Sequence, residues 1–70
     1  MLLLDVDDAA DLAGVSPPTI RQWAHRGHLR SYPRRVYAQS GRLVLRAFYD
    51  RREVLLAERS TRQRGGVRLD

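Results

Sequence analysis

Residues 4–27 read LDVDDAADLAGVSPPTIRQWAHRG, a stretch with two short helical patterns separated by a glycine. In the first pattern, apolar residues recur at three- and four-residue spacing from Val6 to Ala13, which predicts a helix. Asp5 precedes this helix and Asp8 follows three residues later, as in a capping box. Because carboxylates stabilise the positive end of a helix dipole, we interpret these acidic residues as structural.

A second helix is expected directly after a tight turn. Gly14 suits the left-handed residue that ends a helix, Ser16 suits the next cap, and Pro17 suits the first helical turn. The second helix should run from about Ser16 to Arg26 and end at Gly27. Three apolar residues share one face of it and are expected in the core: Ile20, Trp23 and Ala24. The stretch therefore predicts a helix, a turn and a helix.

The middle of the chain predicts a β-hairpin. Between Val36 and Phe48, β-branched, aromatic and leucine residues flank the loop Gln39-Ser40-Gly41-Arg42. A glycine-containing loop of this length joins antiparallel strands. Residues 28–30 are expected to form an extended connection toward Pro33. We refer to the hairpin as the wing.

A third helix is expected after the wing. Asp50 and Glu53 form a second capping box, and the helix should reach about Arg62. Three consecutive apolar residues, 54–56, cover more of a helix than one packed face, so one of them should be exposed. The fold class is thus mainly α with a small β-hairpin, a winged helix-turn-helix over residues 1–62. Residues 63–70 are predicted to be a flexible basic tail.

Charge and composition indicate a nucleic-acid partner. The 70-residue chain has thirteen basic residues against eight acidic ones, for a net charge of +5, and every basic residue is arginine. Arginine is well suited to forked hydrogen bonding with phosphate and guanine. The first twenty residues hold four acids and no arginine, whereas the remainder holds thirteen arginines and four acids. The molecule is therefore electrically polar.

Several function classes are disfavoured by the sequence. A chain this short has little room for an enclosed active site, and we find no nucleophile beside a base and no phosphate-cradling glycine loop. Without cysteine, and with His25 and His28 lacking a third ligand, no metal or cofactor is expected. The apolar run at residues 1–4 is too short for a signal peptide or a membrane span. We expect a cytoplasmic protein that is not an enzyme.

The sequence resembles the MerR-like and phage excisionase-type winged-helix proteins. The resemblance covers about Leu4 to Leu56 and rests on four segments: Leu4-Asp5-Val6, Ala13-Gly14-Val15-Ser16, Thr19-Ile20-Arg21-Gln22-Trp23-Ala24 and Gly27-His28-Leu29. It implies a bacterial or phage protein whose second helix enters the major groove while the wing reaches the adjacent backbone or minor groove. Short members bind DNA as cooperative head-to-tail arrays.

This chain departs from that family at the wing. The usual glycine-rich tip, followed closely by arginine and tyrosine, is replaced by one glycine and then Arg42-Leu43-Val44-Leu45-Arg46. The long dimerisation helix and effector domain of sensing regulators are also missing, so no small-molecule effector is expected.

The resemblance and the residue chemistry together predict a DNA-binding site. On the second helix the predicted contacts are Ser16, Pro18, Thr19, Arg21, Gln22, His25 and Arg26. Arg21 can fork to guanine, although a phosphate contact is equally open, Gln22 can fork to adenine, and Thr19 can reach phosphate or a thymine methyl. In and beside the wing the predicted contacts are Arg30, Arg34, Arg35 and Arg42, which suit phosphates or a narrow minor groove.

The leading function is sequence-specific binding of double-stranded DNA, by a small transcriptional regulator or by an excisionase that acts beside an integrase. Self-association on DNA is a further hypothesis, in which acids of one protomer face arginines of the next. The acids are Asp7, Asp8 or Asp11 and the arginines are Arg51, Arg52 or Arg59. The alternative is a protein-interaction module that docks an acidic partner without DNA.

Overall fold

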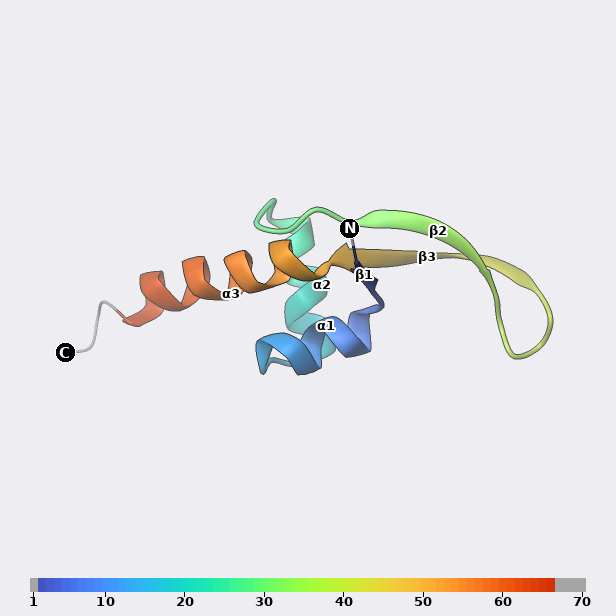
Figure 1. Cartoon of the computed structure of the whole chain (residues 1–70), viewed down its shortest axis with the longest axis horizontal. Helices are drawn as coiled ribbons and strands as arrows, with labels where there is room; N and C mark the ends of the chain where they lie inside the picture. The colour runs from blue at the N-terminus through green and yellow to red at the C-terminus, as the bar shows by residue number, and fades with distance from the viewer. Residues whose placement is uncertain (1, 67–70) are drawn as a thin grey trace.

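The N-terminal half forms two short helices, α1 (Val6–Ala13) and α2 (Pro17–His25), as the sequence predicts. The computed structural model describes residues 2–66. It also contains a strand that the sequence did not indicate, β1 (Leu3–Leu4), because two residues are too few to show a strand pattern. Figure 1 shows α1 and α2 at the middle of an elongated molecule.

The second half forms strand β2 (Tyr32–Tyr37), strand β3 (Leu43–Asp50) and helix α3 (Arg51–Gly66). The three strands make one antiparallel sheet in the order β1-β3-β2. In Figure 1 the β2–β3 hairpin extends to one side and α3 to the other, and the molecule measures 51 × 21 × 19 Å. The winged helix-turn-helix prediction is confirmed.

The hairpin is longer than predicted. Its first strand begins at Tyr32 rather than Val36 and includes Pro33, which has no N–H to donate. Because β2 is an edge strand, this missing donor breaks no sheet ladder. The loop is as expected, since Gly41 takes a φ of 87° and its N–H donates to the Ala38 carbonyl at 2.9 Å. This is the three-residue hairpin turn that requires glycine at its last position.

Both helices of the N-terminal half end at a glycine. Gly14 has a φ of 73° and Gly27 a φ of 84°, so both lie in the left-handed region. In each case the following residue donates its N–H to the carbonyl five residues earlier, at 3.0 Å after α1 and 2.8 Å after α2. These bonds satisfy carbonyls that a helix end leaves without partners. They also fix the direction in which the chain leaves each helix.

Two of the three predicted caps form as expected. Asp5 Oδ1 accepts the Asp8 N–H at 2.8 Å, and Asp50 Oδ2 accepts the Glu53 N–H at 3.2 Å. The bonding of the Ser16 cap was predicted wrongly, because its hydroxyl makes no cap bond to the backbone. Ser16 does occupy the N-cap position, but Pro18 has no N–H and the Thr19 N–H donates to the Ser16 backbone carbonyl at 2.9 Å. The Ser16 hydroxyl instead pairs with the Thr19 hydroxyl at 2.9 Å.

The core is small and joins the helices to the base of the sheet. Ile20 and Val54 are fully buried, and Trp23 is 8% exposed, which confirms its prediction as a core residue. Ala24 is only partly buried against this core. The buried hydrophobic residues are Ala9, Ala10, Ile20, Trp23, Leu29, Tyr49, Val54 and Ala57.

Helix α3 runs to Gly66 rather than ending near Arg62, because Gln63 and Arg64 favour a helix enough to continue it into the glycines. The remaining residues of the predicted tail, 67–70, lie outside the described residues. Leu55 and Leu56 are exposed on α3, as expected for three consecutive apolar positions. Within residues 2–66 no helix is both long enough and apolar enough to cross a membrane.

Candidate nucleic-acid interface

The outward face of α2 collects most of the predicted contacts. Arg21, Gln22, His25 and Arg26 are all exposed, as are Ser16 and Pro18 at the start of the helix. The opposite face is held in the core by Ile20 and Trp23. Because the buried stripe anchors the helix, its polar face is presented to solvent as one rigid surface.

Thr19 differs from the other predicted contacts. It is partly buried, and its hydroxyl already pairs with that of Ser16. A hydroxyl can donate one hydrogen bond and accept others, so the pair keeps capacity for a further partner. Thr19 and Ser16 therefore offer one joint polar group at the N-terminal end of α2, where the helix dipole favours an anion.

Arg21 lies close to the base of the wing. Burial raises the pKa of the Tyr49 phenol, and the positive charge of Arg21 lowers it in part. Tyr49 is on β3 and is only 3% exposed. Tyr49 lies in the same buried cluster as Ile20 and Trp23, so the face of β3 that carries it leads into the core that anchors α2.

The register of the hairpin divides the wing into two faces. Residues directly opposite each other on antiparallel strands point to the same side, and the side alternates at every residue. Paired on one face are Tyr32 with Phe48, Arg34 with Arg46, and Val36 with Val44. Paired on the other are Pro33 with Ala47, Arg35 with Leu45, and Tyr37 with Leu43. We call the first the arginine face and the second the leucine face.

Arg34 and Arg46 stand directly opposite each other on the arginine face, and both are exposed. Two like charges in this position destabilise a hairpin unless an anion lies between or beside them. Arg46 was absent from the predicted site, although its pairing with Arg34 follows once the register is known. Arg34 and Arg35 were predicted together, but the structure puts them on opposite faces of the wing.

The leucine face is apolar beyond its base. Tyr37 is 77% exposed, Leu45 is 70% exposed and Leu43 is 50% exposed, with Arg35 among them. Toward the base, the same face of β3 carries Ala47 and then the buried Tyr49. At the tip, Arg42 is exposed beside Gly41. These leucines were not among the predicted DNA contacts, because the alternation of side chains along a strand does not reveal which face of the strand lies next to α2.

Comparison with known proteins agrees with this arrangement. A family model for a helix-turn-helix domain matches residues 3–47. The chain belongs to the helix-turn-helix domain family. Membership confirms the resemblance drawn from the sequence and indicates double-stranded DNA as the partner of this protein. No curated protein and no solved structure gives a significant match to the chain.

The root of the wing is tied to α3 in this helix-turn-helix protein. The Tyr32 hydroxyl donates to Glu53 Oε2 at 2.9 Å, and the Arg30 guanidinium lies over the Tyr32 ring, 6.0 Å from its centre. Partial burial and the bond to Glu53 raise the pKa of Tyr32, while Arg30 opposes the rise. Arg30 is therefore a candidate DNA contact that is held at the root of the wing, just before β2.

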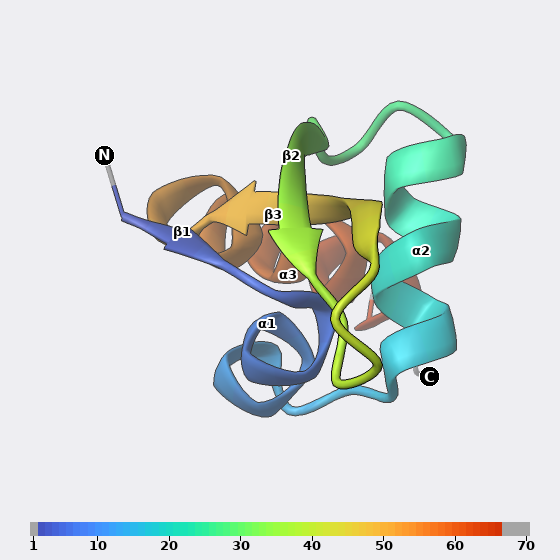
Figure 2. The same cartoon turned by 90° about the vertical axis from the view of Figure 1, so that its right-hand side faces the viewer.

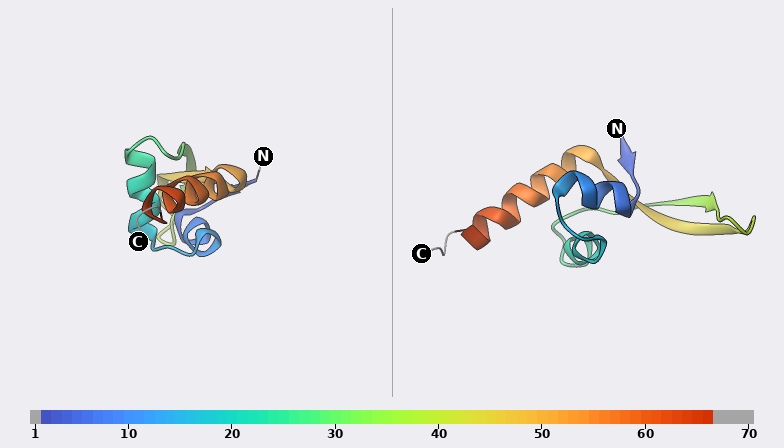
Figure 3. Two further views of the ribbon diagram at one scale, coloured as in Figure 1. Left: turned by 90° about the vertical axis from the view of Figure 1, so that its left-hand side faces the viewer. Right: turned by 90° about the horizontal axis from the view of Figure 1, so that it is seen from below.

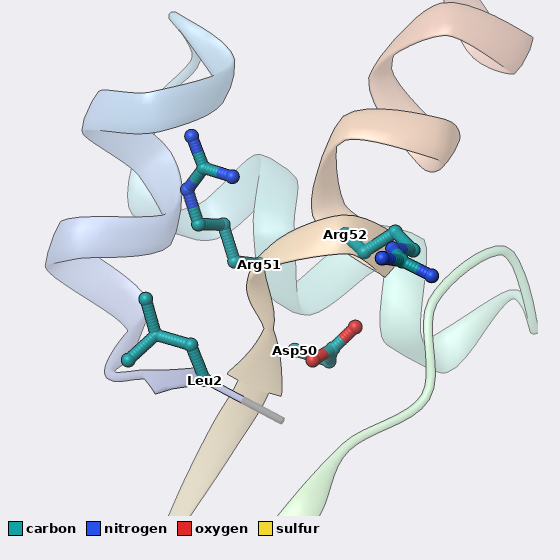
Figure 4. A pocket seen from close by; sticks show the side chains of 4 residues that line it. All are labelled: Leu2, Asp50, Arg51 and Arg52. Atoms are coloured by element: carbon teal, nitrogen blue, oxygen red, sulfur yellow. The ribbon is translucent and has the colours of Figure 1, made fainter.

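The arginines at the start of α3 do not form one patch. Arg51 and Arg52 line a surface depression of about 600 Å³ together with Leu2 and Asp50. Figure 4 shows the two arginine side chains pointing away from one another. Arg51 and Arg52 therefore border the same depression with their side chains pointing in different directions.

Proposed function

We propose that this protein binds double-stranded DNA sequence-specifically, with α2 in the major groove and the wing on the neighbouring backbone or minor groove. The observation that carries the proposal is the exposed polar face of α2, in which Arg21, Gln22, His25 and Arg26 stand opposite a buried stripe. A helix of this kind fits the major groove, where base edges present distinct hydrogen-bonding patterns. The proposed role is binding alone, without catalysis.

Within that face we assign base contacts to Arg21 and Gln22. Arginine forks to the O6 and N7 atoms of guanine, and glutamine forks to the N6 and N7 atoms of adenine. The hydroxyls of Ser16 and Thr19 sit at the N-terminal end of α2 and are assigned to a phosphate. His25 and Arg26 lie at the other end of the helix and are assigned to the opposite backbone strand.

The wing arginines are assigned to phosphates. Arg34, Arg35 and Arg42 are all exposed, and Arg46 joins them on the arginine face. An unshielded pair such as Arg34 and Arg46 gains most from a nearby anion, which supports a backbone contact there. These contacts fix the position of the protein on the duplex but carry little sequence information.

Two biological roles fit the same surface. A small transcriptional regulator would bind at promoters, whereas an excisionase would bind several sites beside an attachment region and contact an integrase. The location of footprints on genomic DNA distinguishes the two. Head-to-tail assembly on DNA fits either role.

The first experiment is selection from a random-sequence duplex library, followed by titration of the selected single site at several salt concentrations. Arg21→Ala should relax the base preference at one position. Arg42→Ala should weaken binding to all sequences alike and should flatten the slope of the log binding constant against log salt concentration by about 0.9. Arg59→Ala is the matched control, an exposed arginine on α3 that is not among the assigned contacts.

Recovery of a motif that Arg21→Ala relaxes would support the proposal. Weak, salt-labile binding with no motif would contradict it and would favour docking of an acidic protein partner through the basic surface. If Arg59→Ala changed binding as much as Arg42→Ala, the assignment of the contact surface would be wrong.

A further inference from the structure

The leucine face of the wing is an exposed apolar patch that is not part of the core. Tyr37, Leu43 and Leu45 are 77%, 50% and 70% exposed, and the strand register puts all three on one side of the hairpin. Single exposed apolar residues are ordinary, but a contiguous group with polar neighbours marks an interaction surface. Arg35, which stands opposite Leu45, is the polar neighbour on this face.

This patch is continuous with the candidate nucleic-acid interface. Along β3, Leu43, Leu45, Ala47 and Tyr49 follow one another on the same face, and Tyr49 lies in the same buried cluster as Trp23 of α2. The patch therefore starts at the core that anchors α2 and leads outward along the wing. Figure 2 looks along the wing and shows α2 beside its root.

The position of the patch also separates it from the other exposed leucines. Leu55 and Leu56 are on α3, and Figure 3 shows, from below, α3 and the wing leading away from α2 in opposite directions. A duplex that binds α2 can continue outward along the leucine face of the wing. The α3 leucines have no such continuity with the interface.

We propose that the leucine face is a minor-groove wedge, in which Leu43 and Leu45 enter the minor groove beside the major groove occupied by α2. This inference rests on the proposed function. Proteins that insert apolar side chains there partly unstack a base step and bend the duplex away from the protein, toward the major groove. Arg35, opposite Leu45 on the same face, holds a phosphate that borders the groove.

The wedge gives the protein a second source of sequence preference. Pyrimidine–purine steps such as TA and CA unstack at lower energetic cost than other steps. The wedge therefore favours such a step about five base pairs, half a helical turn, from the centre of the α2 contact. No hydrogen bond to a base is needed at that position.

The test uses a duplex with the selected site, labelled at its two ends with a fluorescent donor and acceptor, at saturating protein. The variant is Leu43→Thr with Leu45→Thr, because threonine keeps the strand propensity while removing the apolar side chain. The wild type should bend the duplex by about 20–90°, and the variant should bend it by less than about half as much. Affinity should change by about tenfold or less, since the lost contact and the avoided unstacking partly cancel.

Two controls make the result specific. Leu55→Gln with Leu56→Gln removes exposed leucines from α3 and should leave the bend unchanged. Arg35→Gln should lower affinity and its salt dependence while the saturated bend is kept. Circular dichroism and Trp23 fluorescence should match the wild type in every variant, because none of these positions is buried.

The outcomes separate this inference from the proposed function. If the wild type binds its motif through Arg21 but leaves the duplex straight, or if the threonine variant bends it equally, the wedge is overturned and sequence-specific binding stands. If the threonine variant instead loses self-association in sedimentation with an unchanged bend, the patch is a contact between copies of the chain and the wedge is overturned. If no motif is recovered, both proposals fail.

Discussion

Gly14 holds the turn between α1 and α2 in a conformation that other residues adopt at a cost. Its φ is 73°, and no atom lies within 4 Å of an added Cβ, so the cost is purely conformational. We expect Gly14→Ala to lower the free energy of unfolding by about 1–2 kcal/mol. Gly14→Asn should cost less, because asparagine tolerates the left-handed region. Urea denaturation checks both; equal losses would point to a packing cause instead.

Tyr49 links stability to alkaline pH. Its folded-state pKa is raised, chiefly by burial, so folding favours the neutral phenol. The resulting stabilisation is fully present below the ordinary tyrosine value of about 10 and is lost as pH rises through the folded-state pKa. Tyr49→Phe should leave stability at pH 7 nearly unchanged and weaken its decline above about pH 10. Thermal melting between pH 7 and 11 measures this, and an unchanged alkaline decline would contradict it.

The sequence predicted the burial and bonding of some side chains better than those of others. Trp23 was predicted correctly, because its spacing from Ile20 puts both on one helix face. Ser16 was predicted correctly as the N-cap residue, but its hydroxyl makes no cap bond, because Pro18 has no N–H and the Thr19 N–H goes to the Ser16 carbonyl. Exposure of Arg21 followed from the helical period, but the packing of Tyr49 in one cluster with Ile20 and Trp23 is a tertiary contact that no spacing reveals.

Helices were easier to predict than the hairpin. Both N-terminal helices end at the expected glycines or next to them, because the signals that cap and end a helix come from residues close by in the sequence. The hairpin start was missed because Pro33 normally argues against a strand, and only the edge position of β2 makes it acceptable. The division of the wing into two faces required the pairing register, which depends on contacts between strands.

The arginine pair across the wing gives a prediction with opposite effects on folding and binding. Arg46→Glu replaces a like-charge pair with an attractive one opposite Arg34. It should raise the free energy of unfolding by about 0.5 kcal/mol and weaken DNA binding, because a phosphate contact becomes a repulsion. Arg35→Glu, which faces Leu45, is the control and should weaken binding without the gain in stability.

Denaturant titration and binding at matched ionic strength measure the two effects of Arg46→Glu. A variant that lost stability would contradict the cross-strand pairing. One that bound DNA as well as the wild type would remove the arginine face from the contact surface.

Uneven charge along the chain supports assembly on DNA. The exposed Asp7, Asp8 and Asp11 lie on α1, and within residues 2–62 none of them pairs with an arginine. Arg51, Arg52 and Arg59 are exposed on α3. Contact between α1 of one protomer and α3 of the next would repeat along a duplex without closing into a dimer.

Asp8→Asn with Asp11→Asn should reduce cooperativity on a multi-site duplex and leave single-site affinity within about twofold, because surface pairs are weak. Asparagine avoids the added attraction to DNA that a reversal to arginine would bring. Quantitative footprinting on duplexes with one and three sites compares the two quantities. Unchanged cooperativity would contradict the assembly model.

The distribution of buried residues also bears on how this protein can change over generations. Among the residues that the structure describes, the buried hydrophobic side chains lie before Arg30 or after Phe48, so the outer part of the wing, residues 33–46, supplies none of the core. Substitutions along residues 33–46 therefore carry little penalty in folding, apart from the glycine of the turn. A lineage can revise the wing and retarget its outer contacts while the helices that hold the domain together stay as they are.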